Sequence, residues 1–319
     1  MIYTCAPMEG VTGDLFRRAQ AAHFDRAERY YTPFLSPTSS RTLAAREMRE
    51  LDPAHNAGLN VIPQLMGNDP DDFVWMAGAI RDLGYTEVNL NLGCPSGTVT
   101  AKKKGAGLLA ERELLERMLD GIFARSPLPI SIKTRLGCAD ADEFPALVEL
   151  YNRYPVTELI VHARLMVQQY AGTPDLEAFS YALTHSSAPV CYNGDVFDAP
   201  SAAALQARFP KLERVMLGRG LAANPGLITE LRTGVPPTAE ALRSFHETLY
   251  TLTRARIPDK RAALFRMKEA WRYLGCAFED PAKPLKAIRK ATRPEDYEAA
   301  VRLLFASCPV RAHPGFYMT

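Results

Sequence analysis

Short apolar runs alternate with amphipathic stretches along the first three quarters of the chain. Each run is followed by a break containing glycine, asparagine or proline, and then by apolar residues at helical spacing. The runs are Ile2–Pro7, Arg29–Tyr31, Val61–Leu65, Glu87–Leu92, Pro129–Lys133, Glu158–Val161, Pro189–Tyr192 and Arg214–Leu217. Alternating strands and helices are typical of a parallel sheet. Eight strands favour a closed (β/α)8 barrel of the TIM type, an α/β fold, over an open sheet, which would carry an early Gly-x-Gly-x-x-Gly turn.

The helical patterns differ between the two parts of the chain. Asp71–Leu83 and Arg112–Phe123 carry one apolar face each, as expected for helices that line the outside of a barrel. After the linker Thr233–Thr238 the pattern becomes wholly helical, with expected helices at Ala239–Arg256, Asp259–Leu274, Pro284–Ala291 and Glu295–Phe305. We therefore predict a barrel domain over residues 1–237 and a small all-helical domain over residues 238–319.

Composition and charge narrow the class of protein. The chain has 319 residues, of which 47% are hydrophobic and 23% charged, as in ordinary globular proteins. It lacks a long apolar run and a basic leader before a hydrophobic segment, so we expect a cytoplasmic protein without membrane contact. A monomer is expected as well, although no feature of the sequence settles the oligomeric state. The net charge of +2 hides an asymmetry, because residues 239–319 hold 15 Lys and Arg against 9 Asp and Glu. This basic region indicates an anionic partner.

The six cysteines are scattered without a Cys-x-x-Cys pair, which argues against a metal site and against a disulfide framework. Cys94 is the cysteine with informative neighbours, because an apolar strand ends two residues before it, at Leu92, and Pro95 follows it. Downstream, Lys102, Lys103 and Lys104 precede flexible glycines, a combination suited to a polyanion. The sequence therefore places a reactive thiol beside a phosphate-binding segment.

The active site of a βα barrel lies at the carboxyl ends of its strands. The candidate residues that stand there after most of the predicted strands are Met8, Gln64, Asn91, Cys94, Lys133, His162, Arg164, Asn193, Gly194, Asp195, Gly218 and Arg219, and all but Met8 and Cys94 are polar residues or glycines. Lys133 interrupts an apolar strand pattern, and an unpaired buried ammonium is costly, so a functional role is favoured. The glycines after the last two strands, with Arg219, are typical of a phosphate site.

Six segments together resemble the dihydrouridine synthases: Ala6–Thr12, Asn89–Ser96, Ile132–Gly137, Val161–Arg164, Tyr192–Asp195 and Met216–Gly220. Their order and the helical C-terminal domain also agree with that family. The resemblance implies an FMN enzyme that uses NADPH to reduce the C5–C6 double bond of uridine in folded RNA, usually tRNA. Family members commonly have Asp where Gly13 stands, beside the flavin loop, and cofactor binding is still expected with Gly there. They also commonly have fewer charges at 102–104, so ribosomal RNA is kept as an alternative substrate.

By this resemblance Cys94 is the general acid that gives a proton to C5 of the base, while the flavin N5 gives hydride to C6. An ordinary thiol has a pKa of about 8.5 and is mostly protonated near neutrality. The residues expected to bind FMN are Pro7, Met8, Gln64, Lys133, His162, Asn193, Gly194, Asp195, Gly218 and Arg219. Those expected to bind RNA are Asn91, Arg164, Tyr170, Lys102, Lys103, Lys104, Arg272, Lys283, Lys286, Arg289 and Lys290, with Arg293 continuing the stripe of the last three.

Two other classes of function are considered. A barrel flavoenzyme could reduce a free pyrimidine or an enone, but the basic helical domain argues against a small-molecule substrate. A non-catalytic RNA-binding or chaperone protein could keep the barrel, but Cys94, Lys133 and Arg219 argue against that class. Binding of RNA to residues 239–319 would separate the first class from an RNA-modifying enzyme.

Overall fold

A parallel sheet forms the centre of the fold. The computed structural model describes residues 1–37 and 41–317. Within them the sheet has nine strands in the order β3-β2-β1-β9-β8-β7-β6-β5-β4. The strands are β1 (Ile2–Cys5), β2 (Arg29–Tyr31), β3 (Val61–Ile62), β4 (Gln64–Leu65), β5 (Val88–Leu92), β6 (Ile130–Arg135), β7 (Leu159–His162), β8 (Val190–Asn193) and β9 (Arg214–Leu217).

The sheet closes through one broken strand. The predicted strand Val61–Leu65 is divided at Pro63 into β3 and β4, because proline has no N–H for a sheet hydrogen bond. On one side Val61 pairs with Tyr30 of β2, and on the other side Gln64 pairs with Asn89 of β5. Both ends of the strand order therefore belong to a single segment, and the predicted (β/α)8 barrel is confirmed.

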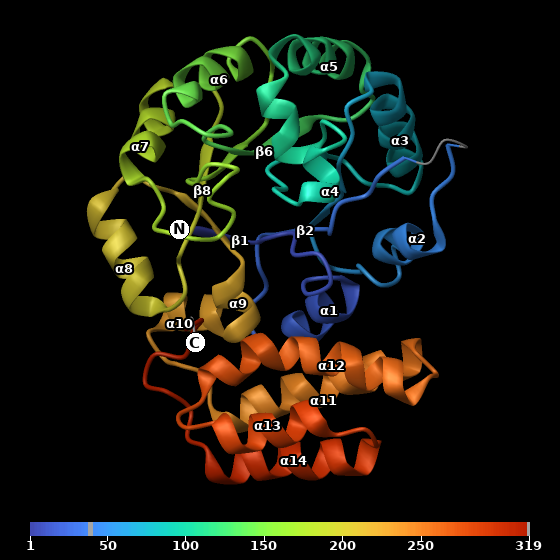
Figure 1. Ribbon diagram of the computed structural model, residues 1–319, viewed down its shortest axis with the longest axis vertical. Helices are drawn as coiled ribbons and strands as arrows, with labels where there is room; N and C mark the ends of the chain where they lie inside the picture. Colours follow the sequence, from blue (N-terminus) through green and yellow to red (C-terminus); the bar gives the residue numbers. More distant parts are fainter. Residues whose placement is uncertain (38–40, 318–319) are drawn as a thin grey trace. The chain divides into compact units, whose positions relative to one another are not determined.

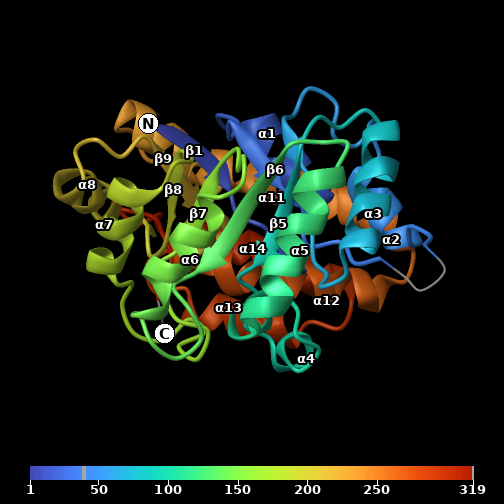
Figure 2. The ribbon, with the colours of Figure 1, turned by 90° about the horizontal axis from the view of Figure 1, so that it is seen from above.

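The chain divides into two compact units that are not continuous in sequence. The first contains residues 1–9, 28–194 and 212–216, and the second contains residues 10–27, 195–211 and 217–319. Helices α3, α5, α6 and α7 of the first unit follow one another along the outside of the strands (Figures 1 and 2). The helices of this unit are α2 (Ala45–Leu51), α3 (Pro70–Asp82), α4 (Gly97–Thr100), the 3-10 helix η1 (Gly105–Ala110), α5 (Arg112–Arg125), α6 (Glu143–Tyr151) and α7 (Leu176–His185).

The second unit is helical. Its elements are α1 (Asp14–His23), α8 (Ala199–Arg208), α9 (Arg219–Ala223), α10 (Leu227–Thr233), α11 (Ala239–Arg256), α12 (Lys260–Leu274), the 3-10 helix η2 (Gly275–Ala277), α13 (Ala282–Lys290) and α14 (Pro294–Ser307). Figure 1 shows α11 to α14 side by side. The Thr238 side chain accepts from the Ala241 N–H and so begins α11 at the predicted residue. The predicted all-helical C-terminal region is confirmed, whereas a domain boundary at 237/238 stays a prediction.

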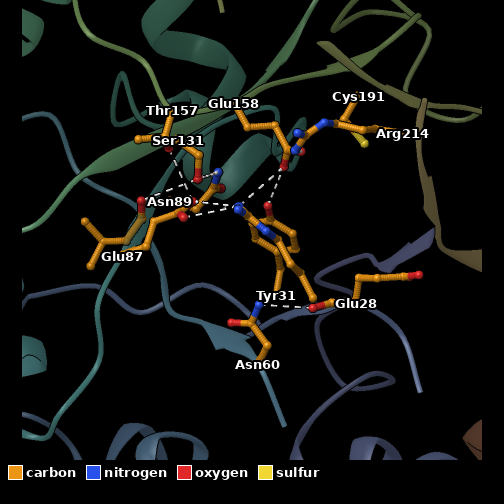
Figure 3. A network of polar contacts seen from close by, with 12 residues as sticks. Glu28, Tyr31, Asn60, Glu87, Asn89, Ser131, Thr157, Glu158, Cys191 and Arg214 are labelled. Carbon is orange, nitrogen blue, oxygen red and sulfur yellow. Dashed lines mark hydrogen bonds and ion pairs between the residues drawn. The ribbon is translucent and has the colours of Figure 1, made fainter. Parts of the chain in front are cut away.

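The inside of the barrel has an apolar layer and a polar end. Residues from five strands, together with Ala6, form the apolar cluster Ala6, Tyr31, Ile62, Ile160, Cys191 and Met216. At the amino ends of the strands the fully buried carboxylate of Glu158 accepts from the Tyr31 hydroxyl at 2.7 Å and from Arg214 at 2.9 Å (Figure 3). Arg29 donates to Glu87 at 3.1 Å beside them. This ion network joins four strands at the end opposite to their carboxyl termini.

None of the helices in residues 1–37 and 41–317 has both the length and the apolar character that a membrane span requires.

Candidate active site

Cys94 lies in the loop after β5, and its backbone is fixed from both sides. The N–H groups of Gly93 and Cys94 both donate to the Asn91 side-chain oxygen at 3.0 Å. On the other side the Cys94 carbonyl accepts from the Ala106 N–H at 3.0 Å. The side chain of Cys94 is partly exposed. The chain therefore presents an accessible thiol on a loop that hydrogen bonds hold in place.

A row of buried side chains orients Asn91. Its amide nitrogen donates to the Gln64 oxygen at 2.7 Å, and the Gln64 nitrogen donates to the Asn89 oxygen at 2.8 Å. The Asn89 nitrogen then donates to the Ser131 hydroxyl at 3.0 Å. Because an amide accepts at one atom and donates at the other, each group fixes the orientation of the next. The Asn91 oxygen is thereby directed at the Cys94 loop.

The sequence predicted no role for Asn89 and Ser131, and Gln64 was expected at the flavin and Asn91 at uracil. The spacing Asn89-x-Asn91 carried a signal, since alternate residues of a strand face the same side. In the structure the oxygen atoms of Gln64 and Asn91 are engaged within the protein. Among the described residues the second amide hydrogen of Asn91 has no acceptor, and it is the atom available to a ligand.

The glycine and lysine segment packs directly behind the thiol. Gly105 has a φ of +56°, and a Cβ there would lie 2.8 Å from the Cys94 carbonyl oxygen, so a side chain at 105 would displace the loop. Lys102 and Lys103 are exposed and Lys104 is partly exposed. Lys103 forms an ion pair with Glu111 at 3.0 Å, whereas Lys102 and Lys104 have no ion-pair partner among the described residues.

Lys133, on β6, is the unusual cation of the site. Burial, followed by the nearby charge of Arg135, lowers its pKa from 10.5 to about 7. The Cys191 and Cys94 thiols lie close enough to affect this pKa in the opposite direction. Within residues 1–37 and 41–317 the ammonium has no hydrogen-bond acceptor and no ion-pair partner. Lys133 can therefore gain or lose a proton near neutrality and has its donors free for a ligand.

The loop after β7 is supported by Arg164. This side chain is fully buried, and its guanidinium donates to the carbonyls of Ala171 at 3.1 Å and Gly172 at 2.6 Å. Tyr170 of the same loop is 55% exposed, and its ring lies 6.0 Å from that of the buried His162. Arg164 was predicted to face a nucleotide. In the structure its guanidinium donates to the backbone of the loop that carries Tyr170 and so stabilises that loop.

Arg135 connects two of these loops, although sequence reasoning gave it no role. Its guanidinium donates to the Gly93 carbonyl at 2.8 Å and to the Leu165 carbonyl at 2.9 Å. The same group lies 5.7 Å from the centre of the Tyr170 ring. Burial lowers the pKa of Arg135 to about 10. Arg135 thus connects the loop that carries Cys94 with the loop that carries Tyr170.

The remaining predicted cofactor residues fall into two groups. In the first unit Pro7 and Met8 follow β1, Met8 packs against the apolar cluster, and Asn193 donates to the Met216 carbonyl at 2.9 Å. Gly194 follows Asn193 directly, and a Cβ there would collide with the Tyr192 ring.

The phosphate residues predicted after the last strands belong to the second unit. Gly218 precedes α9, and Arg219, its first residue, forms an ion pair with Asp195 at 2.7 Å. The pairing of Asp195 with Arg219 was not predicted.

The predicted RNA-binding residues of the helical region are all exposed. Lys283, Lys286, Arg289 and Lys290 lie on α13, and Arg272 lies on α12. None of these five has an acidic partner in the part of the chain that the structure describes. Arg293 lies beyond the end of α13, which ends at Lys290. Arg293 instead precedes α14, where it pairs with Asp296 at 2.8 Å.

Residues 1–37 and 41–317 contain no group of three or more His, Cys, Asp or Glu side chains that could hold a metal ion.

Comparison with known sequences gives a match over nearly the whole chain. The family described as "Dihydrouridine synthase (Dus)" matches residues 4–300. The chain is similar to the probable tRNA-dihydrouridine synthase of Rhodobacter capsulatus, with 28% identity over 315 residues that cover 94% of each chain. It is also similar to the tRNA-dihydrouridine(16) synthase of Shigella flexneri, with 27% identity over 308 residues, 94% of this chain and 97% of the other.

Two solved structures share the fold. Morphinone reductase in complex with tetrahydroNAD is 12% identical, with a TM-score of 0.50 over 76% of this chain and 90% of the other. A variant of NCR from Zymomonas mobilis is 14% identical, with a TM-score of 0.51 over 76% and 90% of the two chains. At these identities the likeness concerns the barrel fold alone.

Proposed function

The chain belongs to the dihydrouridine synthase family, and from that premise we propose that it reduces the C5–C6 double bond of uridine in tRNA to dihydrouridine. The observation that carries the proposal is the partly exposed thiol of Cys94 on a fixed loop, with Lys133, which has no partner among the described residues, close by. The names of the similar proteins from Rhodobacter capsulatus and Shigella flexneri support tRNA as the substrate.

FMN is proposed as the bound cofactor and NADPH as the reductant. The donors present fit a flavin, because Lys133 offers N–H donors without an internal acceptor and can carry charge near neutrality, as the electron-rich edge of a reduced flavin requires. When bound, FMN would supply to C6 of the base the electron pair that NADPH provides. Pro7, Met8 and His162, all of the first unit, are the further proposed contacts to the flavin ring.

The protein's own contribution to the chemistry is a proton at a defined position. The Cys94 thiol holds the proton that C5 requires. The Asn91 side chain fixes the loop that carries this thiol, because its oxygen accepts from two backbone N–H groups of the loop. The free amide hydrogen of Asn91 is the proposed donor to an oxygen of uracil. Gln64 contributes by orienting Asn91 rather than through its own oxygen.

RNA is the proposed substrate rather than free uridine, because a base that is stacked in RNA has to be turned out at a cost of a few kcal/mol. Contacts to phosphates supply that energy. Among residues 1–37 and 41–317, Lys102 and Lys104 have no ion-pair partner beside the thiol, and Lys286 and Arg289 have none on α13. Tyr170, with more than half of its surface exposed, is the proposed aromatic contact to a nucleotide.

The direct test uses tRNA transcribed in vitro, which carries no modified bases. With purified full-length protein, FMN and NADPH, we expect mass spectrometry to find dihydrouridine at a defined position, with no product when NADPH is omitted. Free uridine under the same conditions should react far more slowly than tRNA. Faster reduction of free uridine, or no product with tRNA, would contradict the proposal and favour a small-molecule reductase.

A second prediction concerns the basic face of α13. Charge reversal at Lys286 and Arg289 (Lys286→Glu with Arg289→Glu) is expected to weaken tRNA binding about tenfold at low salt and to lower the slope of log K against log salt by about 2, because each phosphate contact contributes about 1. Binding is measured by filter retention across a salt series. The matched control reverses Arg243 and Arg302, exposed arginines of the same helical region outside the predicted set. Equal losses in both double variants would show a nonspecific charge effect and contradict the role of α13.

A further inference from the structure

The ring of Phe265 on α12 faces solvent. It is 66% exposed, the highest value among the exposed large apolar side chains of residues 1–37 and 41–317. The buried side of α12 is formed by other residues, namely Ala263, Leu264, Met267, Trp271 and Leu274. Single exposed apolar side chains are common on proteins, so the residues around Phe265 decide which partner the ring suits.

Cations stand on both sides of this ring along one stripe of α12. The α12 stripe follows the spacing i, i+4, i+7 and i+11, which keeps residues on one side of a helix, and its members are Arg261, Phe265, Lys268 and Arg272. Arg261 and Arg272 are exposed and have no ion-pair partner in the described parts of the chain. Glu269, beside the stripe, pairs with Arg266 at 3.0 Å. The ring therefore lies where an anionic partner is attracted.

The α12 stripe leads to the basic end of α13. The Lys268 ammonium donates to the carbonyl of Ala291, the residue that directly follows α13. Arg289 and Lys290, the last two residues of that helix, are exposed, and within residues 1–37 and 41–317 neither has an ion-pair partner. Both helices belong to the second unit. The end of α13 thus lies beside the stripe and extends its positive charge.

We propose that Phe265 stacks on an unpaired nucleobase of tRNA, while Arg261 and Arg272 bind phosphates on either side of that nucleotide. This inference rests on the proposed function, in which tRNA is the substrate. Every nucleobase has a flat π face that an aromatic ring can cover, and folded RNA exposes such bases in loops and bulges. At 1.5 Å of helix rise per residue, the two arginines stand about 6 and about 10 Å from Phe265 along the axis, on opposite sides of it.

The composition of the α12 stripe favours RNA over a protein partner. A protein–protein contact has a core of several apolar side chains and is poor in lysine, whereas the stripe has one ring among three cations. An aromatic ring between cations is the arrangement with which proteins bind single-stranded nucleic acid, because the ring meets a base and the cations meet the backbone.

The test measures tRNA binding by the full-length protein without NADPH, by filter retention across a salt series. Phe265→Ala is expected to weaken binding about tenfold, within the usual effect of removing one stacking ring. It should leave the slope of log K against log salt unchanged, because a ring displaces no counterions from RNA. By contrast, Arg261→Gln with Arg272→Gln should lower that slope by about 2. Thermal unfolding of Phe265→Ala should match wild type, because the side chain lies outside the core.

The matched control is Leu303→Ala. Leu303 is another exposed apolar residue of the helical region, on α14, with 47% of its surface exposed, and its loss should leave tRNA binding unchanged. Phe265→Trp keeps a ring and is expected to keep the affinity. Stacking on a base should also quench the emission of the introduced tryptophan when tRNA binds, beyond any change in wild type, which contains Trp75 and Trp271.

Equal affinities of wild type and Phe265→Ala would overturn this inference alone, and so would an equal loss in Leu303→Ala. A wild-type dimer that Phe265→Ala dissociates would also overturn it, because the ring would then contact a second copy of the chain. Protein that binds tRNA through Phe265 but forms no dihydrouridine would contradict the proposed function and support the stacking contact. Wild-type protein that does not bind tRNA would overturn both.

Discussion

Replacement of Cys94 by alanine is expected to lower dihydrouridine formation by a factor of about a hundred to ten thousand, the range that positioned acid catalysis supplies. FMN binding and NADPH oxidation should persist, because the thiol is proposed to act only on C5 of the base. The loop itself should survive the change. The hydrogen bonds that hold it use the backbone N–H and carbonyl of residue 94, which alanine retains.

The measurement is single-turnover conversion of tRNA, with NADPH oxidation followed separately by absorbance. Cys138→Ala is the matched control, because Cys138 is a buried thiol whose sulfur lies 3.5 Å from the carbonyl of Ala106, the residue whose N–H binds Cys94. Burial raises the pKa of Cys138 to about 11, so it is a poor proton donor, and its loss should leave conversion near wild type. Conversion by Cys94→Ala above about a tenth of the wild-type rate would contradict the acid role.

The strands could be predicted because their pattern is local. Each apolar run of the barrel is bounded by glycine, proline or asparagine, and the structure has a strand within every one of them. The break at Pro63 changes only the number of strands, since β3 and β4 together form the predicted segment. Lys133 could be identified in the same way, because an ammonium group inside an apolar strand is costly to bury, whichever group binds it.

The partners of the polar groups could not be predicted, because they depend on distant parts of the chain. The sequence shows that Arg164 and Asn91 stand at strand ends. It does not show that Arg164 binds the backbone of its own loop, or that the Asn91 oxygen binds two N–H groups beside the thiol. The contact of Phe316 with Arg219 joins residues nearly a hundred positions apart. Short-range patterns thus locate the candidate groups, and only the folded chain decides which of them remain free to act.

The polar network at the amino ends of the strands joins partners that are even farther apart in the sequence. Tyr31 and Glu158 are 127 residues apart, and Arg214 is 56 residues from Glu158, yet all three meet inside the barrel. Figure 3 shows the Tyr31 hydroxyl and the Arg214 side chain both directed at the Glu158 carboxylate. Burial, and then the charge of Glu158, raises the pKa of Tyr31 well above its ordinary value, so the hydroxyl stays a donor. Here a large effect on stability is expected rather than one on catalysis.

Glu158→Ala is expected to lower the free energy of unfolding by about 3 to 5 kcal/mol, the cost of removing one partner of a buried ion pair. The carboxylate is fully buried, and its loss leaves Arg214 and the Tyr31 hydroxyl without their acceptor. Urea denaturation followed by circular dichroism measures the change. Glu113→Ala is the matched control, because Glu113 is 93% exposed and its ion pair with Arg117 is 3.9 Å long. It should cost less than about 0.5 kcal/mol.

Tyr31→Phe separates the hydrogen bond from the charge. It removes the hydroxyl while Glu158 keeps Arg214, so a loss of about 1 to 2 kcal/mol is expected, the usual cost of a hydrogen bond to a charged group. Folded Glu158→Ala protein at low temperature should convert tRNA at close to the wild-type rate per molecule, because the network lies at the end of the barrel away from Cys94. A loss of less than about 1 kcal/mol in Glu158→Ala would show that water replaces the carboxylate and that the network adds little to stability.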